Sequence, residues 1–320
     1  MKSLPIVLLA GSLYAMSLGA PLVCADESKP ADASSSSQPA ANAPSEDSAD
    51  AAPTAQVSES TSTSKKPGGV SGLFWKWFKM GERIQADEPD WLSPLATTSG
   101  RLKQELRYDV WRQPGTAGDT DYNFGAGKGL EFIAAPHIQL MVGAPPYIAH
   151  EGGRTPDGFA DIPVMMKIGL ASAGRREGDY LITLLLSATV PGGSSSMRDA
   201  VISPGIALGK GWRNFDVQTT LGGNLPTGDI AAIGRQLVSN TAFQYRALWR
   251  LWPELEVNST FFLEGKNAGQ TQVFLTPGLG FGRIRLWRAL KFSTAAGMQI
   301  AATRFHTYDH RAMFSVRYSF

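Results

Sequence analysis

Charged residues recur at every second position in one short part of this 320-residue sequence. They are Arg101, Lys103, Glu105, Arg107 and Asp109. A spacing of two places side chains on the same face of an extended strand, so the five charges would form a single row. A row of both signs that faces a water-filled passage can select solutes by their charge.

Five more charged residues are expected to face the same interior: Asp216, Arg246, Glu256, Arg311 and Arg317. The first three would lie at similar height on neighbouring strands. If the first and last strands pair antiparallel, Arg311 comes near Asp109, and Arg317 comes near Lys103 and Glu105. All ten residues are therefore candidates for a charged constriction. Interior ion pairs can also simply fill and rigidify a narrow protein interior, and this second interpretation is favoured.

Catalytic chemistry has little support in the sequence. It contains four histidines: His137, His150, His306 and His310. A serine hydrolase needs a Ser beside a His, whereas His137 shares its face with Gln139 and the other three histidines fall in expected loops. His306 and His310 with Asp309 resemble a loop metal site, but such pairs are usually ordinary polar loop residues. No phosphate-binding loop or zinc-helix motif occurs, so we expect no catalytic residue, cofactor or metal.

The overall composition excludes several classes of protein. There are 30 Lys and Arg residues against 28 Asp and Glu residues, a net charge of +2. Nucleic acid is therefore not an expected partner, because phosphate binding needs a concentrated basic surface. The single Cys24 excludes a disulfide framework. Beyond it there is no run of the roughly 18 apolar residues that a membrane-spanning helix needs.

The first 70 residues divide into two segments. Residues 1–25 have the basic start, apolar stretch and small-residue end of a cleavable signal peptide. Cleavage after Ala25 is favoured over lipidation of Cys24, because Val23 does not suit a lipoprotein signal. Residues 26–70 are an acidic linker rich in Ala, Ser and Pro. We expect this linker to be disordered, since it cannot bury enough apolar surface to offset its ordering entropy.

An aromatic segment at residues 71–99 precedes the rest of the chain. It opens with Leu-Phe-Trp-Lys-Trp-Phe-Lys at residues 73–79. Trp and Lys favour a membrane interface, so this segment could be an interfacial helix. It could equally pack as a plug into the mouth of the structure formed by residues 100–320, and the sequence favours neither.

Residues 100–320 alternate apolar and polar residues in short segments. The final segment places Phe314, Val316, Tyr318 and Phe320 on one face. Eleven further segments of this kind precede it, each near the 9–11 residues of a tilted membrane strand. The even count and the alternation of long and short connections are typical of outer-membrane barrels. The sequence therefore predicts an all-β, up-and-down antiparallel transmembrane β-barrel of about twelve strands with a disordered N-terminal extension.

Other features support this prediction over the alternative of a secreted soluble β-protein. Trp249, Trp252 and Trp287 fall at the end with short turns, where an interfacial aromatic girdle belongs. The aromatic C-terminus is typical of the strand that the outer-membrane assembly machinery recognises. We therefore expect that machinery and outer-membrane lipid as partners.

A few residues conflict with regular membrane strands. Lys128 would lie on the lipid face, and a bulge between Gly125 and Gly129 would turn it inward. Pro163, Pro204 and Pro277 each remove a ladder hydrogen bond, so bulges are expected there too.

Three short motifs resemble a known family. Residues 203–209 (Ser-Pro-Gly-Ile-Ala-Leu-Gly) and 276–282 (Thr-Pro-Gly-Leu-Gly-Phe-Gly) share a pattern, and residues 89–95 read Pro-Asp-Trp-Leu-Ser-Pro-Leu. With the terminal strand, they resemble outer-membrane barrels labelled as transporter-like proteins of the meta-pathway of phenol degradation. The resemblance implies passive passage of small aromatic or apolar solutes and implies no particular binding residue. An outer-membrane lipase or deacylase, and a structural barrel that anchors the acidic tail, remain the alternatives.

Overall fold

The computed structural model describes residues 70–115, 119–126, 128–152, 156–192, 199–248, 250–287 and 290–320. The expected signal peptide and all but the last residue of the expected linker lie outside these residues, as does Trp249.

The described residues form two helices and fifteen strands. The helices are α2 (Val70–Asp87) and α3 (Ile230–Ile233). The strands are β1 (Glu105–Pro114), β2 (Thr120–Gly125), β3 (Gly129–Ala135), β4 (Ile138–Gly143), β5 (Tyr147–Glu151), β6 (Gly158–Phe159), β7 (Ile162–Ala173), β8 (Tyr180–Val190), β9 (Val201–Trp212), β10 (Phe215–Pro226), β11 (Gln236–Tyr245), β12 (Leu251–Phe262), β13 (Thr271–Trp287), β14 (Leu290–Ala301) and β15 (His310–Ser319).

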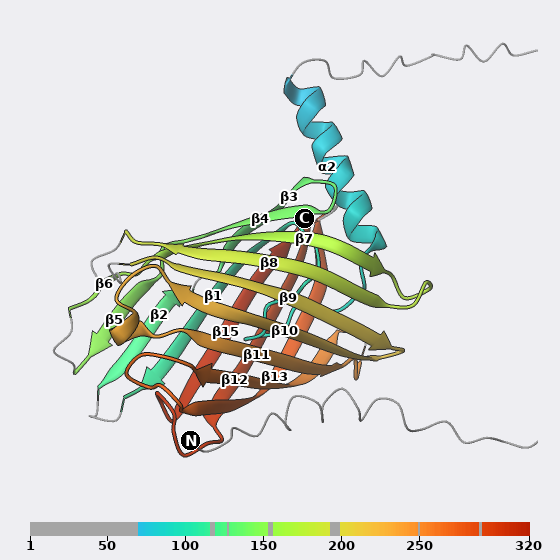
Figure 1. The fold of residues 1–320 in the computed structure, drawn as a ribbon. Coiled ribbons are helices and arrows are strands. Elements are labelled where there is room, and N and C mark those ends of the chain that lie inside the picture. Colours follow the sequence, from blue (N-terminus) through green and yellow to red (C-terminus); the bar gives the residue numbers. More distant parts are fainter. Residues whose placement is uncertain are drawn as a thin grey trace, which may run out of the picture. The chain divides into compact units, whose positions relative to one another are not determined.

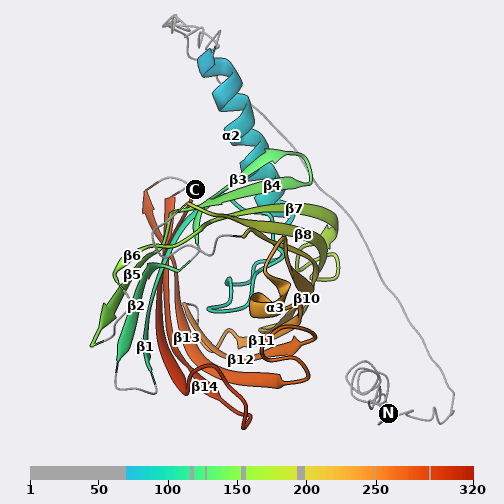
Figure 2. The same cartoon turned by 60° about the vertical axis from the view of Figure 1, so that its left-hand side comes forward.

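These strands close into an antiparallel barrel (Figures 1 and 2). The ring runs β1, β3, β4, β7 and then consecutively from β8 to β15, which pairs back with β1. β2, β5 and β6 extend β3, β4 and β7 at one end, where they pair with the outer part of β1 and with each other. The expected twelve-stranded barrel is thus confirmed, with three strands interrupted.

The two ends of the barrel differ in their connections. One end, the short-turn end, has brief links such as residues 213–214 between β9 and β10. The other, the long-loop end, has connections such as residues 227–235, which contain α3. β1 runs from the short-turn end to the long-loop end, and β15 runs back.

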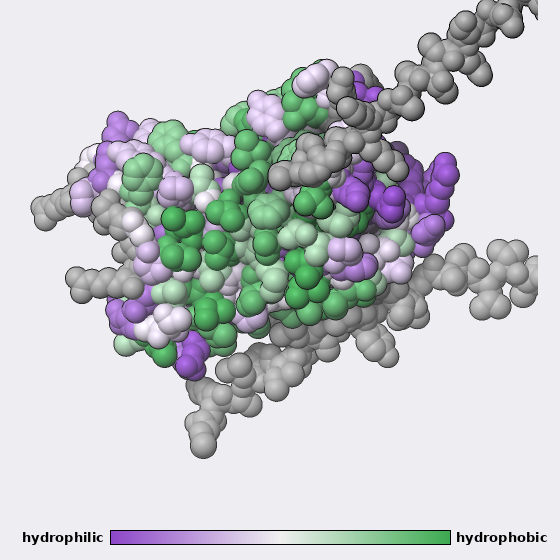
Figure 3. Space-filling model, turned by 90° about the horizontal axis from the view of Figure 1, so that it is seen from above, coloured by the Kyte–Doolittle hydropathy of each residue, from purple (hydrophilic) through white to green (hydrophobic). Residues whose placement is uncertain are grey.

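Side chains alternate between the inside and the outside of the barrel wall. On β12, Glu254, Glu256 and Asn258 are buried inside, whereas Leu255 is exposed outside. Figure 3 shows apolar side chains gathered across the middle of one face, with polar residues toward both ends. A polar interior inside an apolar belt is the arrangement of a membrane-spanning barrel, because lipid faces only every second residue.

A break between two strands stands where a bulge was expected near Lys128. β2 ends at Gly125 and β3 begins at Gly129. Gly125 and Ala126 have positive φ angles of 105° and 43°, which turn the chain between the two strands. Lys128 consequently lines the interior instead of facing lipid.

The bulges expected at Pro163, Pro204 and Pro277 are absent. Pro163 pairs with Thr189 without any shift of register. Leu186 pairs with Pro204 and Leu255 pairs with Pro277 without any shift of register. On its other side each of these two prolines faces a gap in the pairing. Two residues of each strand are unpaired there, between β9 and β10 for Pro204 and between β13 and β14 for Pro277. Each proline therefore loses a hydrogen bond on one side only, which the strand accommodates without an inserted residue.

α2 contacts the barrel at the short-turn end. The indole Nε1 of Trp77 donates to the carbonyl of Ile133 at 2.6 Å, and Gln85 Nε2 donates to the carbonyl of Phe320 at 3.0 Å. Leu73, Phe74 and Trp75 at the other end of the helix are exposed. No helix of the described residues is long and apolar enough to cross a membrane.

The two described tryptophans of the expected aromatic girdle, Trp252 and Trp287, differ in exposure. Trp287 is 69% exposed on the outside of β13. Trp252 is only 2% exposed, so its assignment to the girdle was wrong. It has the same parity on β12 as Glu254 and Glu256, and strand alternation therefore turns it inward.

Candidate functional site

A stretch without regular secondary structure fills part of the barrel interior. Residues 88–104, called the lumen segment below, follow α2 and pass inside the wall before β1 begins (Figure 2). Trp91, Leu92, Leu95 and Leu102 are each at most 5% exposed. Arg101 and Lys103 belong to this segment, so the first strand begins at Glu105 and not at Arg101 as expected.

Two wall arginines bind the backbone of the lumen segment. Arg107 donates from Nη1 to the carbonyl of Pro94 at 3.0 Å and from Nη2 to that of Leu95 at 2.5 Å. Arg317 donates to the carbonyls of Ser93 and Pro94. An irregular segment has no internal partners for its carbonyls, and the guanidinium groups supply them.

Other wall residues complete this attachment. Both carboxylate oxygens of Glu256 accept backbone N–H groups, from Ala96 at 2.8 Å and from Thr97 at 2.5 Å. Gln218 donates to the carbonyl of Leu92 at 3.0 Å and accepts from the hydroxyl of Ser99 at 2.9 Å. The two bonds to the Glu256 carboxylate are charge-assisted and are therefore stronger than the bonds between neutral groups that Gln218 makes.

Three glycines of the wall make room for the apolar side chains of the lumen segment. A Cβ atom added to Gly209 would collide with the ring of Trp91, and one added to Gly280 would collide with Leu92. A Cβ atom added to Gly297 would likewise collide with the side chain of Leu95. Gly209 and Gly280 belong to the two Pro-Gly motifs and Trp91 to the third motif, so the three motifs seen in the sequence meet inside the barrel.

A cluster of buried charges flanks the end of the lumen segment. Lys103 Nζ lies 2.5 Å from Glu105 and 3.4 Å from Glu131, and Lys167 Nζ lies 2.9 Å from Glu131. Gln139 donates to Glu131 at 2.5 Å. Each charge is therefore paired, which a buried ion requires.

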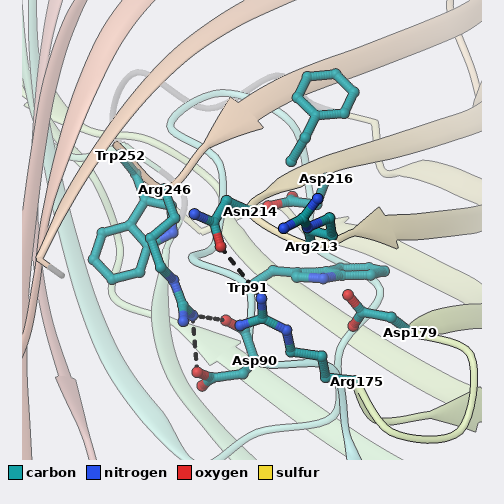
Figure 4. Close-up of a pocket in the computed structure, with 10 residues that line it drawn as sticks. Asp90, Trp91, Arg175, Asp179, Arg213, Asn214, Asp216, Arg246 and Trp252 are labelled. Atoms are coloured by element: carbon teal, nitrogen blue, oxygen red, sulfur yellow. Dashed lines mark hydrogen bonds and ion pairs between the residues drawn. The ribbon is translucent and has the colours of Figure 1, made fainter. Parts of the chain in front are cut away.

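Asp90 anchors the lumen segment at the short-turn end. Its carboxylate lies 2.9 Å from Arg246 and also pairs with Arg283 (Figure 4 draws the first of these pairs). A register shift between Gly282 and Ile284, with a φ of 59° at Arg283, turns that side chain inward. The guanidinium of Arg246 also lies 5.1 Å from the ring of Trp252. The pocket between these groups is small, about 20 Å³.

Glu88, at the start of the lumen segment, is buried. Burial raises its pKa above the ordinary value, although Arg101 and Lys167 favour the charged form. Its Oε2 has no hydrogen-bond partner among the described residues. Burial therefore favours the neutral carboxyl of Glu88 more than water does.

A larger cavity lies on the long-loop side of the lumen segment. This outer cavity has a volume of about 280 Å³. Leu95 and Ala96 of the lumen segment line it, together with wall residues that include Trp111, Lys128, Asn240 and Arg311.

The ten constriction candidates do not form one cluster. Asp109 is bound by Arg107 at 2.7–3.0 Å, and Arg311 bonds to Gln113. The expected approach of Arg311 to Asp109 is wrong, because β1 and β15 pair with Asp109 opposite Ser315. Arg317 stands opposite Arg107 in that register.

The second expected group is separated in the same way. Asp216 bonds to Gln218, Arg246 bonds to Asp90, and Glu256 binds the lumen segment. These three side chains therefore have different partners, although Asp216 lies on β10, Glu256 on β12 and Arg246 directly after β11 between them.

The sequence analysis did not single out several residues of the site: Asp90, Glu131, Gln139, Lys167, Gln218 and Arg283. The wall residues other than Arg283 lie on inward rows, so their strand parity could have indicated them. Arg283 is reached only through a bulge, and Asp90 lies on a segment without periodicity. Neither leaves a signal in the alternation.

Of the three histidines expected in loops, only His306 lies in one, where it pairs with Asp309 at 2.8 Å. His150 lies on β5 and pairs with Asp121 at 2.6 Å, and His310 is the first residue of β15. The described residues contain no group of three or more His, Cys, Asp or Glu that could hold a metal ion.

The fold and the site together define a membrane-spanning β-barrel with an internal segment across its lumen. No protein-family model matches the sequence, and no curated protein matches it significantly. Among solved structures, the NanC porin is similar with a TM-score of 0.45 and 6% identity, over 68% of this chain and 98% of that chain. OccAB2 of Acinetobacter baumannii has a TM-score of 0.32 and 7% identity, over 66% of this chain and 59% of its own. The strand pairing itself establishes the barrel.

Proposed function

We propose that this protein is an outer-membrane channel for small solutes, closed in the present conformation by the lumen segment. One observation carries the proposal. A segment without helix or strand lies across a polar lumen, with a cavity of about 280 Å³ on its long-loop side. A structural core would be expected to fill the interior evenly, whereas a segment of this kind can leave without unfolding the wall.

The outer-membrane location is part of the proposal. It is supported by the apolar outer belt, the even number of ring strands and the long loops at one end. Phe314 and Tyr318 on β15 are exposed on the outer face, Val316 lies on the same face, and Phe320 directly follows the strand. This row supports recognition by the barrel assembly machinery.

Single-channel recording in planar bilayers tests the proposal. The variant Trp91→Ala/Leu92→Ala/Leu95→Ala removes the side chains that seat the lumen segment in the wall. We expect it to open far more often than the wild-type protein. The matched control is Leu73→Ala/Phe74→Ala/Trp75→Ala, which removes similar side chains from the exposed part of α2. A folded triple variant of the lumen segment that never conducts would overturn the proposal.

A second function is favoured by a different observation. The lumen segment is tied to the wall by ion pairs and charge-assisted bonds along most of its length. Such attachment suits a barrel that permanently anchors the N-terminal extension. This interpretation gains support if every variant of the lumen segment stays folded and silent.

The family resemblance suggests small aromatic or apolar compounds as the solutes. Comparing uptake of such compounds by cells with and without the protein tests that suggestion directly.

A further inference from the structure

The outer cavity carries an excess of positive charge. Lys128 and Arg311 both line it, and neither forms an ion pair among the described residues. Asp109 is the acidic residue of the lining, but three short bonds from Arg107 already neutralise it. Two cations therefore face the cavity without a carboxylate partner.

Arg311 is held in one orientation by its neighbours. Its guanidinium carbon lies 4.2 Å from the ring centre of Trp111 and 4.1 Å from that of Tyr308. Nε and Nη2 donate to the Oε1 of Gln113. A guanidinium has five N–H groups, so this arrangement leaves donors for a further acceptor. Stacking fixes the group in advance, which lowers the entropy cost of binding.

The amides that line the cavity also present donors. The side-chain oxygens of Asn240, Asn258 and Gln272 all accept hydrogen bonds within the protein. The amide nitrogens of Asn240 and Gln272 have no hydrogen-bond partner among the described residues. With acceptors occupied and donors left over, the lining suits a negatively charged group.

Aromatic surface adjoins these polar groups. The ring of Phe274 stacks on Tyr308 with 4.4 Å between ring centres, and the rings of Tyr308 and Trp111 both lie against the Arg311 guanidinium. A solute that carries an apolar body beside its charge could therefore bury that body in the same cavity. A volume of about 280 Å³ accommodates a solute several times the size of a water molecule.

We propose that the outer cavity is a binding site for a small organic anion, with its carboxylate drawn to Lys128 and Arg311 and its apolar part against Trp111 and Phe274. The inference rests on the proposed function, since it makes this site the outer entrance of the channel. It narrows the solute from any small aromatic compound to one that carries negative charge.

Equilibrium dialysis on the purified full-length protein tests the site without requiring conduction. The probe is benzoate, and its neutral analogue of the same shape is benzamide. We expect saturable benzoate binding at least tenfold tighter than that of benzamide. Lys128→Met and Arg311→Gln should each weaken benzoate binding tenfold or more, and Lys128→Arg should retain it.

The matched control is Lys266→Met, which removes an exposed lysine from the connection between β12 and β13. It should leave the affinity unchanged. Equal binding of benzoate and benzamide, or an equal loss in Lys266→Met, would overturn the anion site. Heat-modifiable migration of each variant shows whether its barrel is folded.

Ion selectivity of the opened lumen-segment variant separates this inference from the proposed function. Chloride should permeate better than potassium, and Lys128→Met should reduce that preference. Conduction without anion preference would contradict the anion-binding site but not the proposed channel. Benzoate binding by a barrel that never conducts would contradict the channel but not the binding site.

Discussion

Wall side chains form hydrogen bonds with the backbone of the lumen segment. In an open pore, water would form these bonds. Arg107 illustrates this arrangement, because its guanidinium binds both oxygens of Asp109 and two carbonyls of the segment at once. Removing one partner from such a buried set leaves a charge uncompensated, which costs more than the net value of the bond. Single substitutions of these wall residues should therefore measurably change how often the lumen segment lies inside the barrel.

Glu256→Gln tests the attachment at its most specific point. A carboxylate accepts both N–H groups of Ala96 and Thr97, whereas an amide offers one oxygen and sets an NH2 group against the other donor. We expect a loss of about 1–3 kcal/mol in local stability. Amide hydrogen exchange at residues 96 and 97 should accelerate accordingly. Glu264→Gln, at an exposed ion pair with Arg235, is the control, and equal exchange in both variants would contradict the assignment.

Glu88 should make the attachment depend on pH. Burial raises its pKa in the folded state, and Arg101 and Lys167, the cations that face it, only partly oppose this. An acid with a raised folded pKa stabilises the fold below its ordinary pKa, and this contribution is lost as pH rises through the raised value. The lumen segment should thus be held more tightly at pH 4 than at pH 7.5.

Single-channel recording at these two pH values measures that difference. Openings should be rarer in acid, and Glu88→Gln should abolish the dependence because the amide remains neutral. Asp87→Asn changes the adjacent exposed acid and should leave the dependence intact. A pH response that survives in Glu88→Gln must come from another group.

At the scale of elements, the wall is shaped to receive the lumen segment. β9 and β13 each carry a Pro-Gly motif, and their later glycines, Gly209 and Gly280, lie against Trp91 and Leu92. The first glycines of the motifs, Gly205 and Gly278, stand opposite Gly222 and Gly297 on the next strands, where the backbones approach closely. The motifs thus contribute both to the wall and to its fit around the segment.

Gly209→Val tests this fit. The added side chain would occupy the place of the Trp91 ring, so the lumen segment should be displaced. In a Cys24→Ser background, Ser93→Cys reports the displacement, because Ser93 is buried. Maleimide labelling should be at least about tenfold faster with Gly209→Val. Gly223→Val is the control, since a Cβ there makes only ordinary contacts, and unchanged labelling in both would contradict the fit.

The sequence predicts some elements of this structure better than others, for physical reasons. Alternation repeats along each strand, so the ring of strands and their inward faces could be predicted. Register could not, because a shift of two residues keeps the same faces inward; Arg311 consequently reaches Gln113 and not Asp109. The path of residues 88–104 depends on side-chain partners far away in the chain, and no local period encodes it.

At the scale of the whole molecule, the barrel and the lumen segment stabilise each other. The ladder closes through β1 and β15, so the ring has no free edge. The C-terminal residue also joins the two parts, since the backbone N–H of Phe320 donates to the carbonyl of Gln104 at 3.1 Å. We expect closure to keep the wall folded without the segment, while the segment adds apolar contacts and ion pairs inside it.

Heat-modifiable electrophoresis measures both contributions. Unheated wild-type protein in SDS should migrate as a compact barrel and shift on heating, and it should fractionate with outer membranes. The Trp91→Ala/Leu92→Ala/Leu95→Ala variant should still form the compact species, because its strand pairing is untouched. Its transition should fall by about 5 °C or more, since each truncation removes buried apolar contacts worth about 2–5 kcal/mol before the wall relaxes. An unshifted transition of the variant would mean that the lumen segment adds little stability to the barrel. A wild-type protein that is found in the periplasm and shows no heat-modifiable migration would contradict the membrane barrel itself.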